Sequence, residues 1–173
     1  MTLSLYTATI PSYLQILTAL SGLLNKTEDH CAEQGIEPAA MIEARLAEDM
    51  LPFGYQIKAT VGHSVGAIAA VREGSFSPDR SAWPTDFAGL QTLVASARAT
   101  LEAIKPDDLN GAMGRPMRFA MGEMCMDFLT EEFLLSFSQP NFYFHASTAY
   151  AIARWKGVPL GKRDYLGAVR LIR

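Results

Sequence analysis

Two histidines of the sequence lie where an imidazole can face a protein interior. His63 lies in QIKATVGHSVGAIAA, among alanines and glycines, and His145 lies in PNFYFHASTAYAIARW, between Phe142 and Ala149. Neutral imidazole is a common metal ligand, so two inward histidines from different helices can converge on one ion. Two ligands are nevertheless fewer than a structural or catalytic metal site uses.

Each histidine also has an explanation that needs no metal. His145 can be a buried ring that hydrogen-bonds a backbone carbonyl or a side-chain hydroxyl. His63 can line a pocket as a polar group, or it can make an ordinary hydrogen bond between helices. These alternatives stay open at the level of sequence.

A second set of polar side chains shares one helical face with the spacing i, i+4, i+7 and i+11. Its members are Tyr143, Ser147, Tyr150 and Arg154. A stripe of this kind suits the wall of a cleft, and equally a subunit interface, because interfaces are enriched in tyrosine and arginine. With Gln56 and His63, these four residues are the predicted pocket residues.

The stretch around His63 has two unlike sides. From about Leu51-Pro52 to Arg72 it has helical periodicity, and large aliphatic residues follow one face: Ile57, Val61, Val65 and Ile68. The other side carries small or polar residues: Gln56, Ala59, His63, Gly66, Ala67 and Ala70. Such a helix either approaches its neighbours closely or borders a hollow.

Three further stretches are predicted to be long helices. They run from about Leu3 to Gln34, from the N-caps Thr85 or Asp86 to Ile104, and from Pro140 to about Gly157. Pro11 should kink the first of them or mark its true start. Shorter helices are expected over Ala39–Glu48 and from Thr130 to Phe137.

The segment MRFAMGEMCMDF alternates in hydrophobicity, which predicts a β-hairpin rather than a helix. We expect Gly122-Glu123 to form a type II′ turn, because that turn favours glycine first. The predicted cross-strand pairs are Met121 with Met124, Phe119 with Met126, Met117 with Phe128, and Arg118 with Asp127. The fold class predicted from the residues is therefore an all-α four-helix bundle, with a short hairpin before the last long helix.

Composition excludes several kinds of protein. A chain of 173 residues fits a single domain, 1–173, and its net charge of −3 with a pI near 5.6 predicts no nucleic-acid or anionic-membrane partner. No apolar run is long enough to cross a bilayer, and no signal peptide is recognisable. The distant Cys31 and Cys125 are expected to be reduced thiols, so we expect a cytoplasmic location.

Three long stretches resemble one bacterial family of unknown function in the DinB/YfiT-like group. They are SLYTATIPSYLQILTALSGLL, ARLAEDMLPFGYQIKATVGHSVGAIAAVREG and PNFYFHASTAYAIARWKGVPLGKRDYLG. The resemblance implies an up-down-down-up four-helix bundle, commonly a homodimer. Many members of the group hold a divalent metal, such as zinc or nickel, through three histidines. His63 and His145 match two of these, but Ala149 stands where the third is needed.

These observations predict a cytoplasmic, dimeric protein that binds a small molecule in an interhelical cleft and has no catalytic set. The first alternative is a metal-dependent enzyme, a thiol-dependent transferase or isomerase, with an incomplete site at His63 and His145. The second is an interaction protein whose stripe of Tyr143, Ser147, Tyr150 and Arg154 forms a dimer interface.

Overall fold

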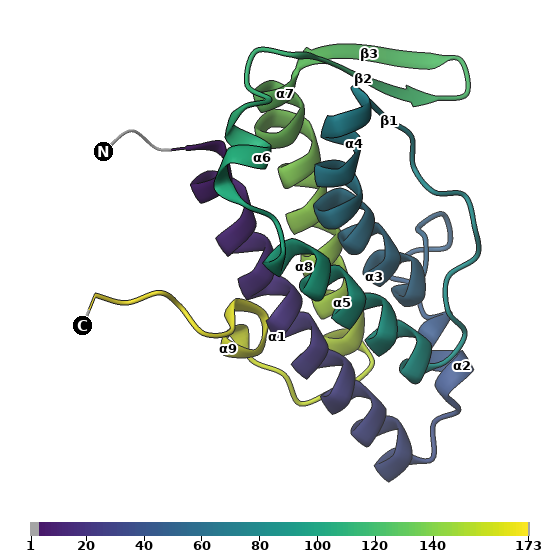
Figure 1. Cartoon of the computed structure of the whole chain (residues 1–173). Helices are drawn as coiled ribbons and strands as arrows, with labels where there is room; N and C mark the ends of the chain where they lie inside the picture. The colour runs from purple at the N-terminus through teal and green to yellow at the C-terminus, as the bar shows by residue number, and fades with distance from the viewer. Residues whose placement is uncertain (1–3, 173) are drawn as a thin grey trace.

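The computed structural model describes residues 4–172, and most of them belong to four long helical segments (Figure 1). The first segment is α1, Leu5–Gln34. It begins at Ser4, whose side chain accepts a hydrogen bond from the Thr7 amide, and ends at Gly35 in the left-handed conformation, φ 64°. Pro11 lies inside α1, so it does not mark the start. The start predicted at Leu3 lies outside the described residues.

The second long segment is continuous but has three parts: α3 Phe53–Val61, the π-helical η1 Gly62–Gly66, and α4 Ala67–Glu73. Its bounds agree closely with the prediction. The short helix before it, α2, covers only Pro38–Ile42 and not Ala39–Glu48. The chain turns away there because the amide of Phe53 donates to the carbonyl of Ala44 and draws the following loop back.

The third long segment is α5, Phe87–Glu102, which is capped by the Asp86 side chain as predicted. The fourth is a continuous helix made of α7 Thr130–Glu132, η2 Phe133–Ser138 and α8 Gln139–Trp155. The predicted break before Pro140 is wrong. Ser138 and Gln139 keep helical backbone angles, so the helix continues from η2 into α8. Pro140 is tolerated because it lies in the first turn of α8.

Figure 1 shows the path of the chain through these segments. Helix α1 runs away from the sheet and α3–η1–α4 returns toward it. Residues 77–86 then cross back along the outside, so α5 runs in the same direction as the second segment. The last segment returns in the opposite direction. Two further short helices, α6 Pro106–Asn110 and α9 Lys162–Leu166, pack against α1.

The sheet lies across one end of the helices and has the strand order β1-β2-β3 (Figure 1). Strands β2 Pro116–Met121 and β3 Met124–Leu129 form the predicted hairpin, with every predicted pair in register. Gly122 has φ 64° and no described non-glycine residue has positive φ, which matches the predicted type II′ turn. The two-residue β1, Ser75–Phe76, pairs in parallel with β2 and was not predicted. The all-α expectation is therefore too narrow: the fold is mostly helical with a small three-stranded sheet.

The core fills the space between the long segments with fully buried apolar side chains. Tyr13 of α1 is among them, and its ring meets Phe142 of α8 edge to face at 4.6 Å. The Tyr13 hydroxyl has no hydrogen-bond partner among the described residues, and burial raises its pKa.

None of the helices within residues 4–172 combines the length and the apolar character that crossing a bilayer requires.

Replacing Tyr13 by phenylalanine should therefore stabilise the protein. An unsatisfied buried hydroxyl costs about 1–3 kcal/mol, so Tyr13→Phe should raise the free energy of unfolding by about 1 kcal/mol. Urea denaturation measures this change. Tyr13→Leu, which removes the ring that contacts Phe142, should instead lower the stability, and a loss of stability in the Phe variant would contradict the interpretation.

Candidate functional site

His63 belongs to the π-helical η1 and is hydrogen-bonded to the other π-helical segment. The hydroxyl of Ser138, the last residue of η2, donates to the His63 carbonyl at 3.0 Å, and the same oxygen lies 3.3 Å from His63 Nδ1. A serine hydroxyl has one proton, which the carbonyl already takes, so Nδ1–H must be the donor to Ser138 Oγ. This assigns the Nδ1–H tautomer to His63 and leaves Nε2 as an acceptor. π-Helical turns are frequent at functional sites.

His145 of α8 has the same tautomer for a similar reason. The amide nitrogen of Gln56 donates to the Leu51 carbonyl at 2.8 Å, which leaves Gln56 Oε1 as the acceptor for His145 Nδ1–H at 2.7 Å. The sequence alternative in which His145 is satisfied by a carbonyl or hydroxyl is thus wrong in detail. The partner is a side-chain amide from the second long segment.

The two imidazoles lie beside each other across the contact between the second and last segments. Their ring centroids are 5.7 Å apart and their planes differ by 16°. Burial, together with the neighbouring His145, lowers the pKa of His63 to about 4, and burial lowers that of His145 to about 4. Both rings are therefore neutral at neutral pH.

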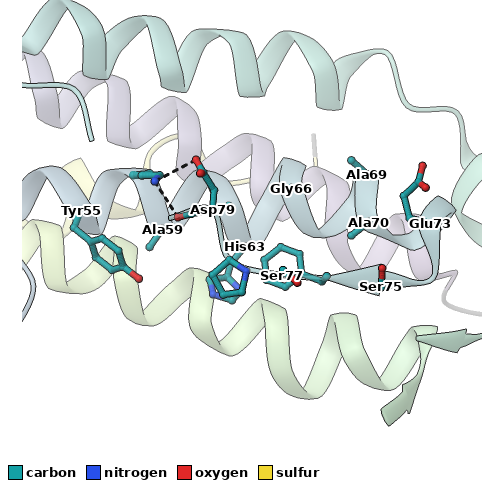
Figure 2. A pocket seen from close by; sticks show the side chains of 14 residues that line it. Tyr55, Ala59, His63, Gly66, Ala69, Ala70, Glu73, Ser75, Ser77 and Asp79 are labelled. Atoms are coloured by element: carbon teal, nitrogen blue, oxygen red, sulfur yellow. Dashed lines mark hydrogen bonds and ion pairs between the residues drawn. The ribbon is translucent and has the colours of Figure 1, made fainter. Parts of the chain in front are cut away.

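A hollow of about 340 Å³ lies against the small-residue face of α3–η1–α4, on the side of His63. Figure 2 shows its lining along this face, from Tyr55 at one end to Glu73 at the other. The predicted Ala59, Gly66 and Ala70 contribute to the wall. The opposite wall is the strand and loop from Ser75 to Asp79, and Phe76 packs on His63 with ring centroids 5.4 Å apart.

The loop that closes the hollow is held by Lys58, whose side chain is nearly buried. Its ammonium group donates to the Asp79 carbonyl at 2.9 Å, to the Ser81 carbonyl and to the Ser81 hydroxyl at 3.0 Å. It also lies 3.1 Å from the Asp79 carboxylate (Figure 2). Hydrogen bonds from Ser81 and Lys58 lower the pKa of Asp79 to about 2. The charge of Lys58 is therefore already neutralised within the protein.

Of the predicted pocket residues, only His63 lines this hollow. Gln56 does not line the hollow, and its side chain is the hydrogen-bond partner of His145. Tyr150 is half-buried against the core, with its ring 6.1 Å from that of Tyr165 in α9. Arg154 donates to the Val158 carbonyl at 3.3 Å and so closes the end of its own helix.

The remaining two members of the stripe also lie away from the hollow. Tyr143 is half-buried and packed against the core, and Ser147 is exposed, with its hydroxyl donating to the Phe144 carbonyl at 3.1 Å. The stripe that shares one helical face in the sequence is therefore divided between core, helix end and solvent. The hollow instead borders the small-residue face of the second long segment, α3–η1–α4.

The donor set does not fit a three-histidine metal site. His63 and His145 are adjacent and each keeps a free Nε2, but Ala149 is fully buried and offers only a methyl group. Within residues 4–172, no group of three or more His, Cys, Asp or Glu side chains is arranged to hold an ion. Gln56 and Ser138 contact the histidines at Nδ1, so they orient the rings and do not complete a ligand set.

The fold, mostly helical with a small sheet, is similar to that of a solved DinB family member. The chain is similar to a crystal structure described as a DinB family member protein from Shewanella denitrificans, with 26% identity and a TM-score of 0.81. The alignment covers 98% of this chain and 95% of that one. Residues 5–166 match the family described as Domain of unknown function (DUF1993), and the chain belongs to that family. A comparison with curated proteins gives no match.

Several site residues were missed from the sequence. Tyr55 could have been found, because it lies eight residues before His63 on the same helical side. Ser138 carried no signal, since it was assigned to the break between two predicted helices. Phe76 and Asp79 lie in residues 75–85, whose two prolines predict only a loop.

The two neutral histidines, His63 buried and His145 half-buried, make stability depend on pH in a defined window. An unfolded histidine has a pKa of 6.5, whereas both folded values are about 4. Above pH 6.5 the histidine rings are unprotonated in both the folded and the unfolded state, so the free energy of unfolding does not depend on their protonation. Between pH 6.5 and 4 the unfolded chain binds more protons, so the free energy of unfolding should fall by about 1–3 kcal/mol per ring. Urea titrations across this range measure the loss.

The control for this loss is the double variant His63→Gln/His145→Gln. It lacks both titrating rings, so its stability should change less between pH 6.5 and 4 than that of the wild type. Equal pH dependence in the two proteins would contradict the assignment.

The tautomers can be observed directly. Long-range ¹H–¹⁵N spectra at neutral pH should show Nδ1 protonated and Nε2 unprotonated in both His63 and His145. Gln56→Leu removes the acceptor of His145 alone, so only the His145 pattern should change. A protonated Nε2 on either ring of the wild type would overturn the hydrogen-bond assignment.

Proposed function

We propose that the protein binds a small, uncharged organic molecule in the hollow beside His63, and that it does so without a catalytic set. The observation that carries the proposal is the hollow itself, of a size at the lower end of the range for small-molecule sites. Its walls are mainly apolar or small side chains, with His63 as a polar group between them. Such a combination selects a ligand by shape and by few hydrogen bonds.

The charges around the hollow argue against an anionic ligand. His63 is neutral, and Lys58 is paired with Asp79 and with the carbonyls of the loop. Glu73 at the other end adds a negative group. An anion entering here would lose water and find no free cation among the lining residues, which is unfavourable.

The free acceptor on His63 adds a requirement for the ligand. Because Nδ1–H is directed to Ser138, Nε2 is the ring atom that a ligand can contact. A bound molecule with a hydroxyl or N–H group would satisfy it. The favoured class is therefore a small uncharged compound that carries one hydrogen-bond donor.

The other functions considered from the sequence find less support. A metal-dependent transferase or isomerase would need a third ligand in place of Ala149, which is a buried methyl group. A dimer interface on the last helix would use Tyr150 and Arg154, whose side chains already contact their own chain.

We also propose the up-down-down-up bundle topology of the DinB/YfiT type, which the path of the four segments supports. A cytoplasmic location is supported by Cys31 and Cys125, which are both free thiols.

Binding can be tested with phenol and anisole, which have nearly the same shape and differ in the hydroxyl donor. Saturation-transfer NMR should detect phenol binding, and anisole should bind about two- to tenfold more weakly, the effect of one hydrogen bond. Gly62 lines the hollow, and a Cβ there would meet open space. Gly62→Leu should therefore fill the hollow and reduce phenol binding by about tenfold or more.

The matched control is Gly22→Leu, the same substitution at an exposed position of α1 that also has free space. It should leave phenol binding unchanged. Wild-type protein that binds neither compound, or a Gly62→Leu variant that binds phenol as well as the control, would refute the proposal.

A further inference from the structure

The outer strand of the sheet presents a free backbone edge. Among the strands of residues 4–172, β3 pairs with β2 alone, and Figure 1 shows it outermost, farthest from the helices. Natural edge strands are usually protected by charged side chains, especially lysine, by proline or by a bulge. The one charged residue of β3, Asp127, is already paired with Arg118 of β2. Among its six residues, MCMDFL, there is no lysine or proline, and its register with β2 has no bulge. An edge of this kind is a template for another strand.

The hairpin geometry determines which backbone groups of β3 are free. In a two-residue hairpin the residues flanking the turn, Met121 and Met124, form a hydrogen-bonded pair, so even-numbered residues of β3 bond to β2. Two hydrogen bonds confirm this alternation between even- and odd-numbered residues. The Thr130 amide donates to the Arg115 carbonyl on the β3 side, and the Arg118 amide donates to Gly74 on the opposite side of β2. The amides and carbonyls of Cys125, Asp127 and Leu129 therefore point outward from the sheet.

We propose that this edge pairs with β3 of a second copy of the chain, antiparallel and about a two-fold axis. The pairing would join two three-stranded sheets into one continuous sheet of six strands. This inference is independent of the ligand proposed for the hollow, which lies on the second helical segment.

Hydrogen bonding and charge favour a register with the two-fold axis at Met126 over one with the axis at Asp127. A two-fold axis through Asp127 would place two carboxylates opposite each other, which is unfavourable. With the axis at Met126, the outward groups of Cys125 and Asp127 exchange hydrogen bonds with Asp127 and Cys125 of the other copy. Met126 then faces its own counterpart in a non-hydrogen-bonded pair, where side chains approach most closely.

The side chains fit this register on both faces of the sheet. On the face toward the helices, Met124 would lie opposite Phe128 of the other copy. Met124 is 51% exposed in the monomer, so this contact would remove apolar surface from water. On the other face, Asp127 is already held by Arg118 through hydrogen bonds of 2.6 and 2.9 Å. The charge of Asp127 therefore stays paired when a second strand arrives, and no unpaired charge is buried.

The first test uses Cys125, an exposed residue that would lie opposite Asp127 of the other copy. Sedimentation velocity over about a hundredfold concentration range should show a reversible dimer of the wild-type chain. Cys125→Asp places like charges opposite each other at two symmetric positions and should weaken dimerisation about fivefold or more. Cys125→Lys should preserve or strengthen it. Residue 125 is exposed in the monomer, and urea denaturation verifies that both variants fold.

The second test reports the register. In a non-hydrogen-bonded antiparallel pair the Cα atoms lie about 4.5 Å apart, within the range a disulfide spans. With oxidised glutathione as oxidant, Cys125→Ser/Met126→Cys should form an intermolecular disulfide at least about tenfold faster than the wild-type Cys125 does. Cys31 is buried and common to both proteins.

Each alternative result overturns the proposal. The first is a chain that stays monomeric at every concentration. The second is a dimer that Cys125→Asp and Cys125→Lys affect equally, which would place the interface elsewhere, for example on the last helix. The third is faster cross-linking through Cys125 than through residue 126, which would show a different register.

Discussion

The packing of two neutral imidazoles side by side, His63 buried and His145 half-buried, is the constraint on which the centre of this protein depends. A buried ring must keep its N–H satisfied and must not be charged. Gln56 meets the first requirement for His145 and Ser138 meets it for His63, and each of these partners comes from the opposite helical segment. The two hydrogen bonds therefore tie the second long segment to the last one. They also direct both Nε2 atoms away from the polar partners.

The hollow beside His63 depends on the close approach of the loop after β1 to the small residues of α3–η1–α4. Gly54 illustrates this, because a Cβ there would lie 2.5 Å from the Trp83 ring. Lys58 then holds the intervening loop through its carbonyls, and β1 attaches the start of that loop to β2. The wall of the hollow and the sheet are thus parts of one connected structure. A ligand in the hollow would contact a loop that is fixed at both ends.

Membership of the DUF1993 family and the DinB-like fold do not by themselves define an activity, since unrelated functions share folds. The residues at the centre are more informative. Where a third histidine would complete a metal set, Ala149 is fully buried in the core. Each of the two histidines has a hydrogen-bond partner at Nδ1, and each leaves an uncharged Nε2 as an acceptor.

The sequence by itself determined the four long helical stretches, the hairpin with its exact register and the small-residue face around His63, because these depend on local periodicity and turn chemistry. It could not reveal β1, which has two residues and no alternation, or the helix that continues through Pro140. Only the tertiary structure decided that Ser138 and Gln56 hold the histidines, and that the Tyr143–Arg154 stripe faces core and solvent rather than the hollow. Those outcomes depend on which segments meet in space, and helical spacing defines a face without defining its neighbour.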